Sequence, residues 1–150
     1  MRTILLITLQ LLDRLHFLHD KGFIHRDLKP ENILVGLGNK SNTVYIIDYG
    51  LSKRYIDPHT GEHVPLRTGK ALTGTPRFSS VNTHLGFETS RRDDLESLMY
   101  IVIYLARGSL PWQGLHVHKG EDRYKKILNK KKGHQLRSYV RDFLMNLQNI

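Results

Sequence analysis

Two short motifs constrain the fold of this chain more than any other feature. Residues 25–32 read H-R-D-L-K-P-E-N, and residues 48–50 read D-Y-G at the end of an apolar run. Eight consecutive residues of this kind, followed by an aspartate, an aromatic residue and glycine, are a specific signal. Asp27, Asn32 and Asp48 supply the oxygen groups that phosphoryl transfer needs to orient a hydroxyl and to hold magnesium.

The segment between the motifs predicts a small β-hairpin. Residues 33–35 and 44–47 are short apolar runs, and a polar turn containing glycine separates them. Asp27 and Asn32 then lie just before the first strand, and Asp48 lies just after the second. We therefore expect these three side chains to converge on one edge of the hairpin.

Hydrophobic periodicity predicts helices on both sides of the motifs. Residues 94–106 are apolar on nearly every face, which indicates a helix at the centre of the domain. A first helix should end at Lys21 and Gly22, and a basic helix should cover about residues 122–131. The apolar positions of the first helix and of a last, amphipathic helix are Ile4, Leu5, Leu9, Leu12, Leu15 and Leu18, and Leu136, Val140, Phe143, Leu144 and Leu147.

The remaining segment, residues 51–89, has no sustained periodicity and is rich in glycine, proline, threonine and basic residues. So long an irregular stretch in a compact domain usually carries function. A chain of 150 residues is enough for one domain that buries about 70% of its unfolded surface. We expect residues 1–150 to form a single, mainly helical unit.

Composition excludes several classes of protein. No apolar stretch is long enough for a membrane span, and the start lacks a signal peptide, so the expected location is the cytosol, with the nucleus as the alternative. Zero cysteines exclude disulfides and thiolate zinc sites. The histidine pairs His16/His19 and His116/His118 lack a third ligand at suitable spacing, so histidine metal binding is not expected.

The net charge of +9 favours anionic partners without choosing among them. The densest basic run comprises Lys125, Lys126, Lys130, Lys131 and Lys132. We interpret it as a solvated helix face, with a nuclear-import or nucleic-acid patch as the alternative.

Four further motifs narrow the interpretation. Residues 72–75 (L-T-G-T), 82–86 (N-T-H-L-G), 90–98 (S-R-R-D-D-L-E-S-L) and 107–115 (R-G-S-L-P-W-Q-G-L) closely resemble the casein kinase I family of serine/threonine kinases. The similarity covers about residues 2–132. Where most protein kinases have Ala-Pro-Glu, that family has a Ser-Ile-Asn-like triplet, and Ser80-Val81-Asn82 stands there in this chain.

The resemblance implies a fold and a set of catalytic roles. The fold would be a kinase-like C-terminal lobe with one or two short β-hairpins. Asp27 would accept the proton of the substrate hydroxyl, Lys29 would neutralise charge on the ATP phosphate, and Asn32 and Asp48 would hold Mg²⁺. Thr75 matches a threonine that bonds the catalytic aspartate and lysine.

The resemblance also allows two other positions, Asp94 and Tyr49, to be compared with the family. Asp94 is similar to a buried aspartate that braces the catalytic loop, although an ordinary carboxylate at a helix N-terminus is the alternative. Tyr49 replaces the usual phenylalanine of the metal-binding turn, and its hydroxyl would need a partner if buried.

The family favours acidic or previously phosphorylated protein substrates, and no membrane or specific nucleic acid is expected as a partner. By alignment Arg77 and Arg123 match residues that coordinate an anion, and Arg67 and Lys70 would help. Guanidinium groups grip phosphate oxygens bidentately. The alternative is that these are scattered solvated charges.

A complete kinase also needs a glycine-rich loop and a strand lysine paired to a helix glutamate, and neither occurs in this sequence. We therefore expect the smaller lobe to be absent and the 150-residue chain alone to be inactive. The competing hypotheses are a non-catalytic module that binds phosphoproteins and a basic nucleic-acid-binding protein. The latter lacks a recognised motif.

Overall fold

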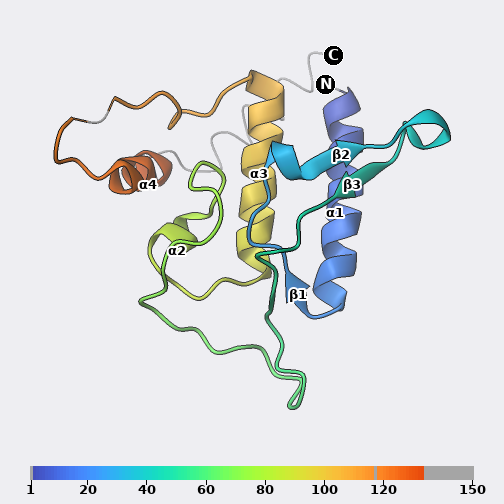
Figure 1. The fold of residues 1–150 in the computed structure, drawn as a ribbon, viewed down its shortest axis with the longest axis horizontal. Helices are drawn as coiled ribbons and strands as arrows, with labels where there is room; N and C mark the ends of the chain where they lie inside the picture. Colours follow the sequence, from blue (N-terminus) through green and yellow to red (C-terminus); the bar gives the residue numbers. More distant parts are fainter. Residues whose placement is uncertain (1, 117, 134–150) are drawn as a thin grey trace.

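The computed structural model describes residues 2–116 and 118–133 of the chain. Its order of elements is α1 (Arg2–Asp20), β1 (Phe23–Ile24), η1 (Pro30–Asn32), β2 (Ile33–Val35), η2 (Gly38–Lys40), β3 (Val44–Ile46), β4 (Lys53–Arg54), α2 (Val81–His84), α3 (Arg91–Arg107) and α4 (Arg123–Gly133). Helices α1 and α3 lie side by side, and α4 lies next to α2 on the other side of α3 (Figure 1). The chain is thus mainly helical with small antiparallel strand pairs.

Helix α3 is the centre of the hydrophobic core, as its sequence predicts. Ile101 is completely buried, and Leu98, Val102 and Ile103 are nearly so. The helix begins at Arg91, three residues before the predicted start, because the Asp93 carboxylate accepts a hydrogen bond from the Ser90 backbone N–H at 2.7 Å. It ends at Gly108, which adopts a left-handed conformation.

The predicted hairpin is present. Strands β2 and β3 pair antiparallel with Ile33 opposite Ile46, and Val44 and Ile46 point into the core. A second pair, β1 with β4, joins the segment after α1 to the start of the region that the sequence indicates is irregular. Two-residue strands are too short for a periodic pattern, and therefore periodicity does not reveal them.

The periodic pattern predicts helix α1 correctly, but only some of its apolar positions are buried. Leu11 and Leu15 are buried against the core, whereas Leu5, Leu9 and Leu12 are exposed. Further apolar side chains are exposed on the hairpin and the turn after it, namely Leu34, Val35, Leu37, Tyr45, Ile47, Tyr49 and Leu51. This much uncovered apolar surface is typical of a contact face.

The basic helix α4 corrects one expectation about charge. Lys125, Lys130 and Lys132 are exposed, as a solvated face requires, but Lys131 is only 2% exposed. Its Nζ donates hydrogen bonds to the carbonyl oxygens of Pro76 at 2.9 Å and Ser79 at 2.5 Å. Burial lowers the pKa of the Lys131 ammonium to about 7. The predicted helix through Leu136 and Leu147 lies outside the described residues.

No helix within residues 2–116 and 118–133 is long and apolar enough to cross a membrane.

The buried lysine predicts a pH-dependent stability. In the unfolded chain Lys131 stays protonated up to its ordinary pKa of 10.5, whereas the folded chain releases that proton near pH 7. The unfolded state therefore binds more protons above pH 7, and the free energy of unfolding should rise with pH by up to about 1.4 kcal/mol per unit. Urea denaturation between pH 7 and 9 should show this rise in the unsubstituted chain and in Lys132→Met, but not in Lys131→Met. Parallel curves for all three would contradict the assignment.

Candidate active site

The 25–32 loop is held by one buried carboxylate of α3. Asp94 is 2% exposed, and it accepts hydrogen bonds from the backbone N–H groups of His25 at 2.8 Å and Arg26 at 2.9 Å. It also bonds His19 Nε2 at 2.9 Å. Asp94 therefore makes the bracing contacts expected of it, besides lying in the first turn of the helix.

The same loop contains a strained residue. Arg26 has φ +70° and Asp48 has φ +63°, and no other non-glycine residue in the described part of the chain has a positive φ. Such conformations cost about 1–3 kcal/mol and persist where surrounding contacts enforce them. The bond from Arg26 N to Asp94 and a 2.6 Å bond from Arg26 Nε to the Leu51 carbonyl provide that enforcement.

Asp27 is the polar centre of the site. Its Oδ1 accepts hydrogen bonds from the backbone N–H and the hydroxyl of Thr75, both at 2.8 Å. Its Oδ2 accepts one from Lys29 Nζ at 2.7 Å. The hydrogen bond to Asp27 raises the pKa of the Lys29 ammonium, so this lysine stays charged. The structure thus brings together the three residues that the sequence predicts for catalysis.

Asn32 and Asp48 lie where the hairpin places them. Asn32 Nδ2 donates to the Asp27 carbonyl at 3.0 Å, which leaves its amide oxygen available, and the Asn32 carbonyl accepts from Ile47 N at 3.0 Å. Asp48 follows directly and is exposed. An amide oxygen and a carboxylate are hard donors of the kind that Mg²⁺ prefers. The described residues contain no cluster of three or more His, Cys, Asp or Glu side chains suited to a metal.

Gly74 allows the segment that carries Thr75 to approach this loop. Its φ is +83°, and a Cβ added there would lie 2.3 Å from the Arg26 carbonyl oxygen and 3.3 Å from Asp27 Oδ1. Only glycine tolerates both the backbone conformation and the contact. The short distance between the two segments therefore depends on residue 74.

Tyr49 finds a hydrogen-bond partner. Its hydroxyl donates to the Ile46 carbonyl at 3.1 Å, and its ring lies 5.3 Å from the His25 ring. The extra oxygen is therefore satisfied within the hairpin, and the Tyr49 side chain is half exposed.

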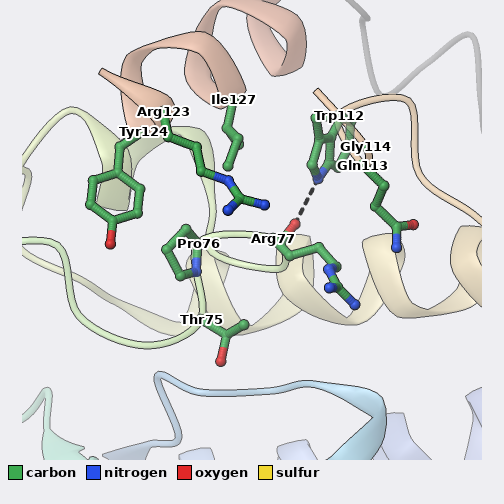
Figure 2. Close-up of a pocket in the computed structure, with 9 residues that line it drawn as sticks. All are labelled: Thr75, Pro76, Arg77, Trp112, Gln113, Gly114, Arg123, Tyr124 and Ile127. Atoms are coloured by element: carbon green, nitrogen blue, oxygen red, sulfur yellow. Dashed lines mark hydrogen bonds between the residues drawn. The ribbon is translucent and has the colours of Figure 1, made fainter. Parts of the chain in front are cut away.

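A second site lies between the segment after Thr75 and α4. Arg77 and Arg123 line one pocket of about 330 Å³, together with Thr75, Pro76, Trp112, Gln113, Gly114, Tyr124 and Ile127. Figure 2 shows the Arg123 guanidinium directed into the pocket toward Pro76 and Arg77, while the Arg77 side chain runs along the edge below Trp112 and Gln113. We call this cavity the Arg77–Arg123 pocket.

Arg67 and Lys70 do not line that pocket. Lys70 pairs with Glu88 at 3.2 Å, and it lines a separate pocket that also contains Arg26 and Lys53. The Arg67 carbonyl accepts a hydrogen bond from Glu88 N at 2.7 Å. The structure therefore does not place these two basic residues as helpers of Arg77 and Arg123.

Glu88 is a residue whose importance the sequence does not reveal. It is only 6% exposed, and Lys53 Nζ donates to it at 2.5 Å. Burial by itself would raise the pKa of Glu88, but the bonds from Lys53 and Lys70 outweigh it and hold the pKa below its ordinary value. A single glutamate in an irregular segment gives no pattern that distinguishes this ion pair from a solvated charge.

Comparison with known protein families agrees with this geometry. The family model described as the protein kinase domain matches residues 1–149. The chain belongs to the protein kinase family, whose members transfer phosphoryl groups to proteins and generally use ATP and Mg²⁺.

The close approach at Gly74 gives a stability prediction. Gly74→Ala should lower the free energy of unfolding by about 3 kcal/mol or more, because the new Cβ meets the Arg26 backbone in addition to the left-handed strain. Gly61→Ala is the matched control, since Gly61 has φ +72° with no atom within 4 Å of an added Cβ. It should lose only about 1–2 kcal/mol. Equal losses in urea denaturation would contradict the proposed close packing.

Proposed function

We propose that the chain is the catalytic-loop half, or C-terminal lobe, of a casein kinase I-like serine/threonine kinase. The reaction is transfer of the ATP γ-phosphoryl group to a serine or threonine of acidic or previously phosphorylated proteins. The observation that carries this proposal is the hydrogen bonding of the Asp27 carboxylate, because Thr75 donates to one of its oxygens and Lys29 donates to the other. The motif resemblance supports the subfamily, and Lys29 two residues after Asp27 is typical of serine/threonine kinases.

The hydrogen bonds indicate which oxygen of Asp27 takes the proton. A carboxylate oxygen has two lone-pair directions, and Oδ1 already accepts two bonds from Thr75. Oδ2 accepts only the bond from Lys29, so it has capacity for one more. Asp27 Oδ2 would therefore receive the proton of the substrate hydroxyl as that oxygen attacks phosphorus and the bond to the ADP oxygen breaks.

Lys29 has a second task in this proposal. Its ammonium stays charged because of Asp27, and the field of Asp48 contributes as well. A fixed positive charge beside the transferred group stabilises negative charge that develops there. Bound Mg²⁺ would supply further charge neutralisation, and the Asn32 amide oxygen and the Asp48 carboxylate are the groups that would hold it.

The preference for anionic substrates rests on the Arg77–Arg123 pocket. Both side chains are exposed and contribute to one concave site next to Thr75, so a bound phosphate would lie near the catalytic aspartate. Arginine is suited to this task because it binds phosphate with two parallel hydrogen bonds.

The role of Asp27 predicts a large loss of turnover on a neutral substitution. In a protein that joins this chain to the small lobe of a casein kinase I, Asp27→Asn should reduce single-turnover phosphoryl transfer by about 10²-fold or more, because the base is removed while the shape is kept. Asp13→Asn, the same change on the exposed face of α1, should retain full activity. Transfer by Asp27→Asn at the unsubstituted rate would refute the assignment.

The anion site predicts a change of selectivity. The double variant Arg77→Gln and Arg123→Gln should lose at least about tenfold of the preference for phosphorylated over neutral peptides, since charged hydrogen bonds contribute about 1.5–3 kcal/mol each. The control Arg2→Gln and Arg14→Gln removes the same charge from exposed positions of α1. Measurements at two salt concentrations separate a bidentate pocket from a screened surface field. Unchanged selectivity in the variant of Arg77 and Arg123 would favour the alternative that these arginines are scattered solvated charges.

A further inference from the structure

Lys131 is buried in contact with backbone and aromatic groups of other segments. Its Nζ donates to the Pro76 and Ser79 carbonyls, and it lies 4.8 Å from the Tyr100 ring centroid and 5.1 Å from that of Trp112. Within the described residues no carboxylate lies at ion-pair distance from it. Burial of an ammonium is costly, and the two carbonyl bonds and the ring faces offset only part of that cost, in agreement with the lowered pKa of Lys131.

Lys131 donates its hydrogen bonds to a turn that other side chains also contact. We define the 75–79 turn as residues 75–79, closed by bonds from Phe78 N and Ser79 N to the Thr75 carbonyl. Trp112 Nε1 donates to the Arg77 carbonyl at 2.7 Å (Figure 2), and His84 Nε2 lies 3.0 Å from the Pro76 carbonyl. Three carbonyls of the turn thus point outward to side chains rather than into a helix or sheet.

The charge state around Lys131 suits this arrangement. A carbonyl oxygen can only accept, so His84 Nε2 must carry the proton of its hydrogen bond to Pro76. A protonated Nε2 cannot accept a hydrogen bond from Lys131 Nζ, although the two nitrogens are 3.3 Å apart. Burial, then the lysine charge, lowers the pKa of His84 to about 4, which keeps the imidazole neutral. From α3, Glu96 contributes a weaker favourable field.

The two arginines of the pocket come from the two elements that Lys131 joins. Arg77 lies in the 75–79 turn, whereas Arg123 and Lys131 both belong to α4, at its start and near its end. We propose that Lys131 is a positioning residue that fixes the separation of Arg77 and Arg123, and thereby sets the affinity of their pocket for a tetrahedral dianion. This inference rests on the function proposed for the pocket. Lys131 itself does not line it.

The test uses the full 150-residue chain labelled with ¹⁵N, titrated with a phosphoserine peptide and separately with inorganic phosphate. Lys131→Met keeps the aliphatic stem but removes the charge and the donors, and it should weaken binding of the dianion at least about tenfold, or about 1.4 kcal/mol. Lys131→Arg retains a cation that can donate and lie over the rings, so it should recover most of the affinity. Lys132→Met removes an exposed charge on the neighbouring residue and should bind like the unsubstituted chain.

A spectroscopic readout separates positioning from general destabilisation. Trp112 is the only tryptophan, so its indole N–H gives one resonance that reports the bond to the Arg77 carbonyl. Lys131→Met should shift this resonance and speed its hydrogen exchange, while circular dichroism shows the same folded fraction. If Lys131→Met does not fold, Lys131→Gln, which keeps a neutral donor, should show the same weakening.

The possible results distinguish this inference from the proposed function. Full affinity in the folded Met or Gln variant, with binding abolished by Arg77→Gln, would overturn the role of Lys131 and leave the pocket intact. Weakened binding with an unmoved Trp112 resonance would also overturn it. Lys131-dependent binding of inorganic phosphate but not of the peptide would support the inference and contradict the protein-substrate proposal. Absence of binding to the unsubstituted chain would overturn both.

Discussion

The buried Asp94 carboxylate is the interaction on which the site depends. It extends from the central helix and accepts hydrogen bonds from the backbone N–H groups of His25 and Arg26, so it fixes the loop at Arg26, one of the two non-glycine residues with a positive φ in the described part of the chain. A carboxylate with two backbone donors compensates both its own burial and the left-handed strain at Arg26. The direction of Asp27, the next residue, follows from that constraint. Asp94 therefore links the core around Ile101 to the loop that carries Asp27.

The parts of the site that are close in sequence could be predicted from it. The hairpin between residues 33 and 46 has a clear apolar pattern, and its pairing puts Asn32 next to Ile47, one residue before Asp48. Thr75 is different, because its 2.8 Å contacts with Asp27 span the irregular segment. Only the motif resemblance indicated them, since no periodicity links residues 27 and 75. Gly74 explains in physical terms how the two segments approach so closely.

Charged residues are where sequence patterns gave the least information. A lysine-rich helix predicts a solvated face, and three of its lysines are exposed, but Lys131 is buried among carbonyls and aromatic rings. Likewise, the resemblance predicted Lys70 as a helper in an anion site, whereas in the structure it pairs with the buried Glu88. A charge becomes buried only when partners from distant segments satisfy it, and these partners leave no local pattern. In α1 the same limitation applies to Leu9 and Leu12, since periodicity identifies an apolar face without showing what covers it.

The 75–79 turn connects the two candidate sites physically. At its first residue the Thr75 hydroxyl and N–H hold Asp27, and two residues later Arg77 enters the pocket shared with α4. The turn is too short to belong to a helix or a sheet, so its position is determined by side chains that bond its carbonyls. A displacement of that turn would consequently change the environment of the Asp27 carboxylate and the geometry of the Arg77–Arg123 pocket together. In the proposed function, substrate selection by Arg77 and Arg123 and proton transfer to Asp27 would therefore share one structural element, although their residues are far apart in sequence.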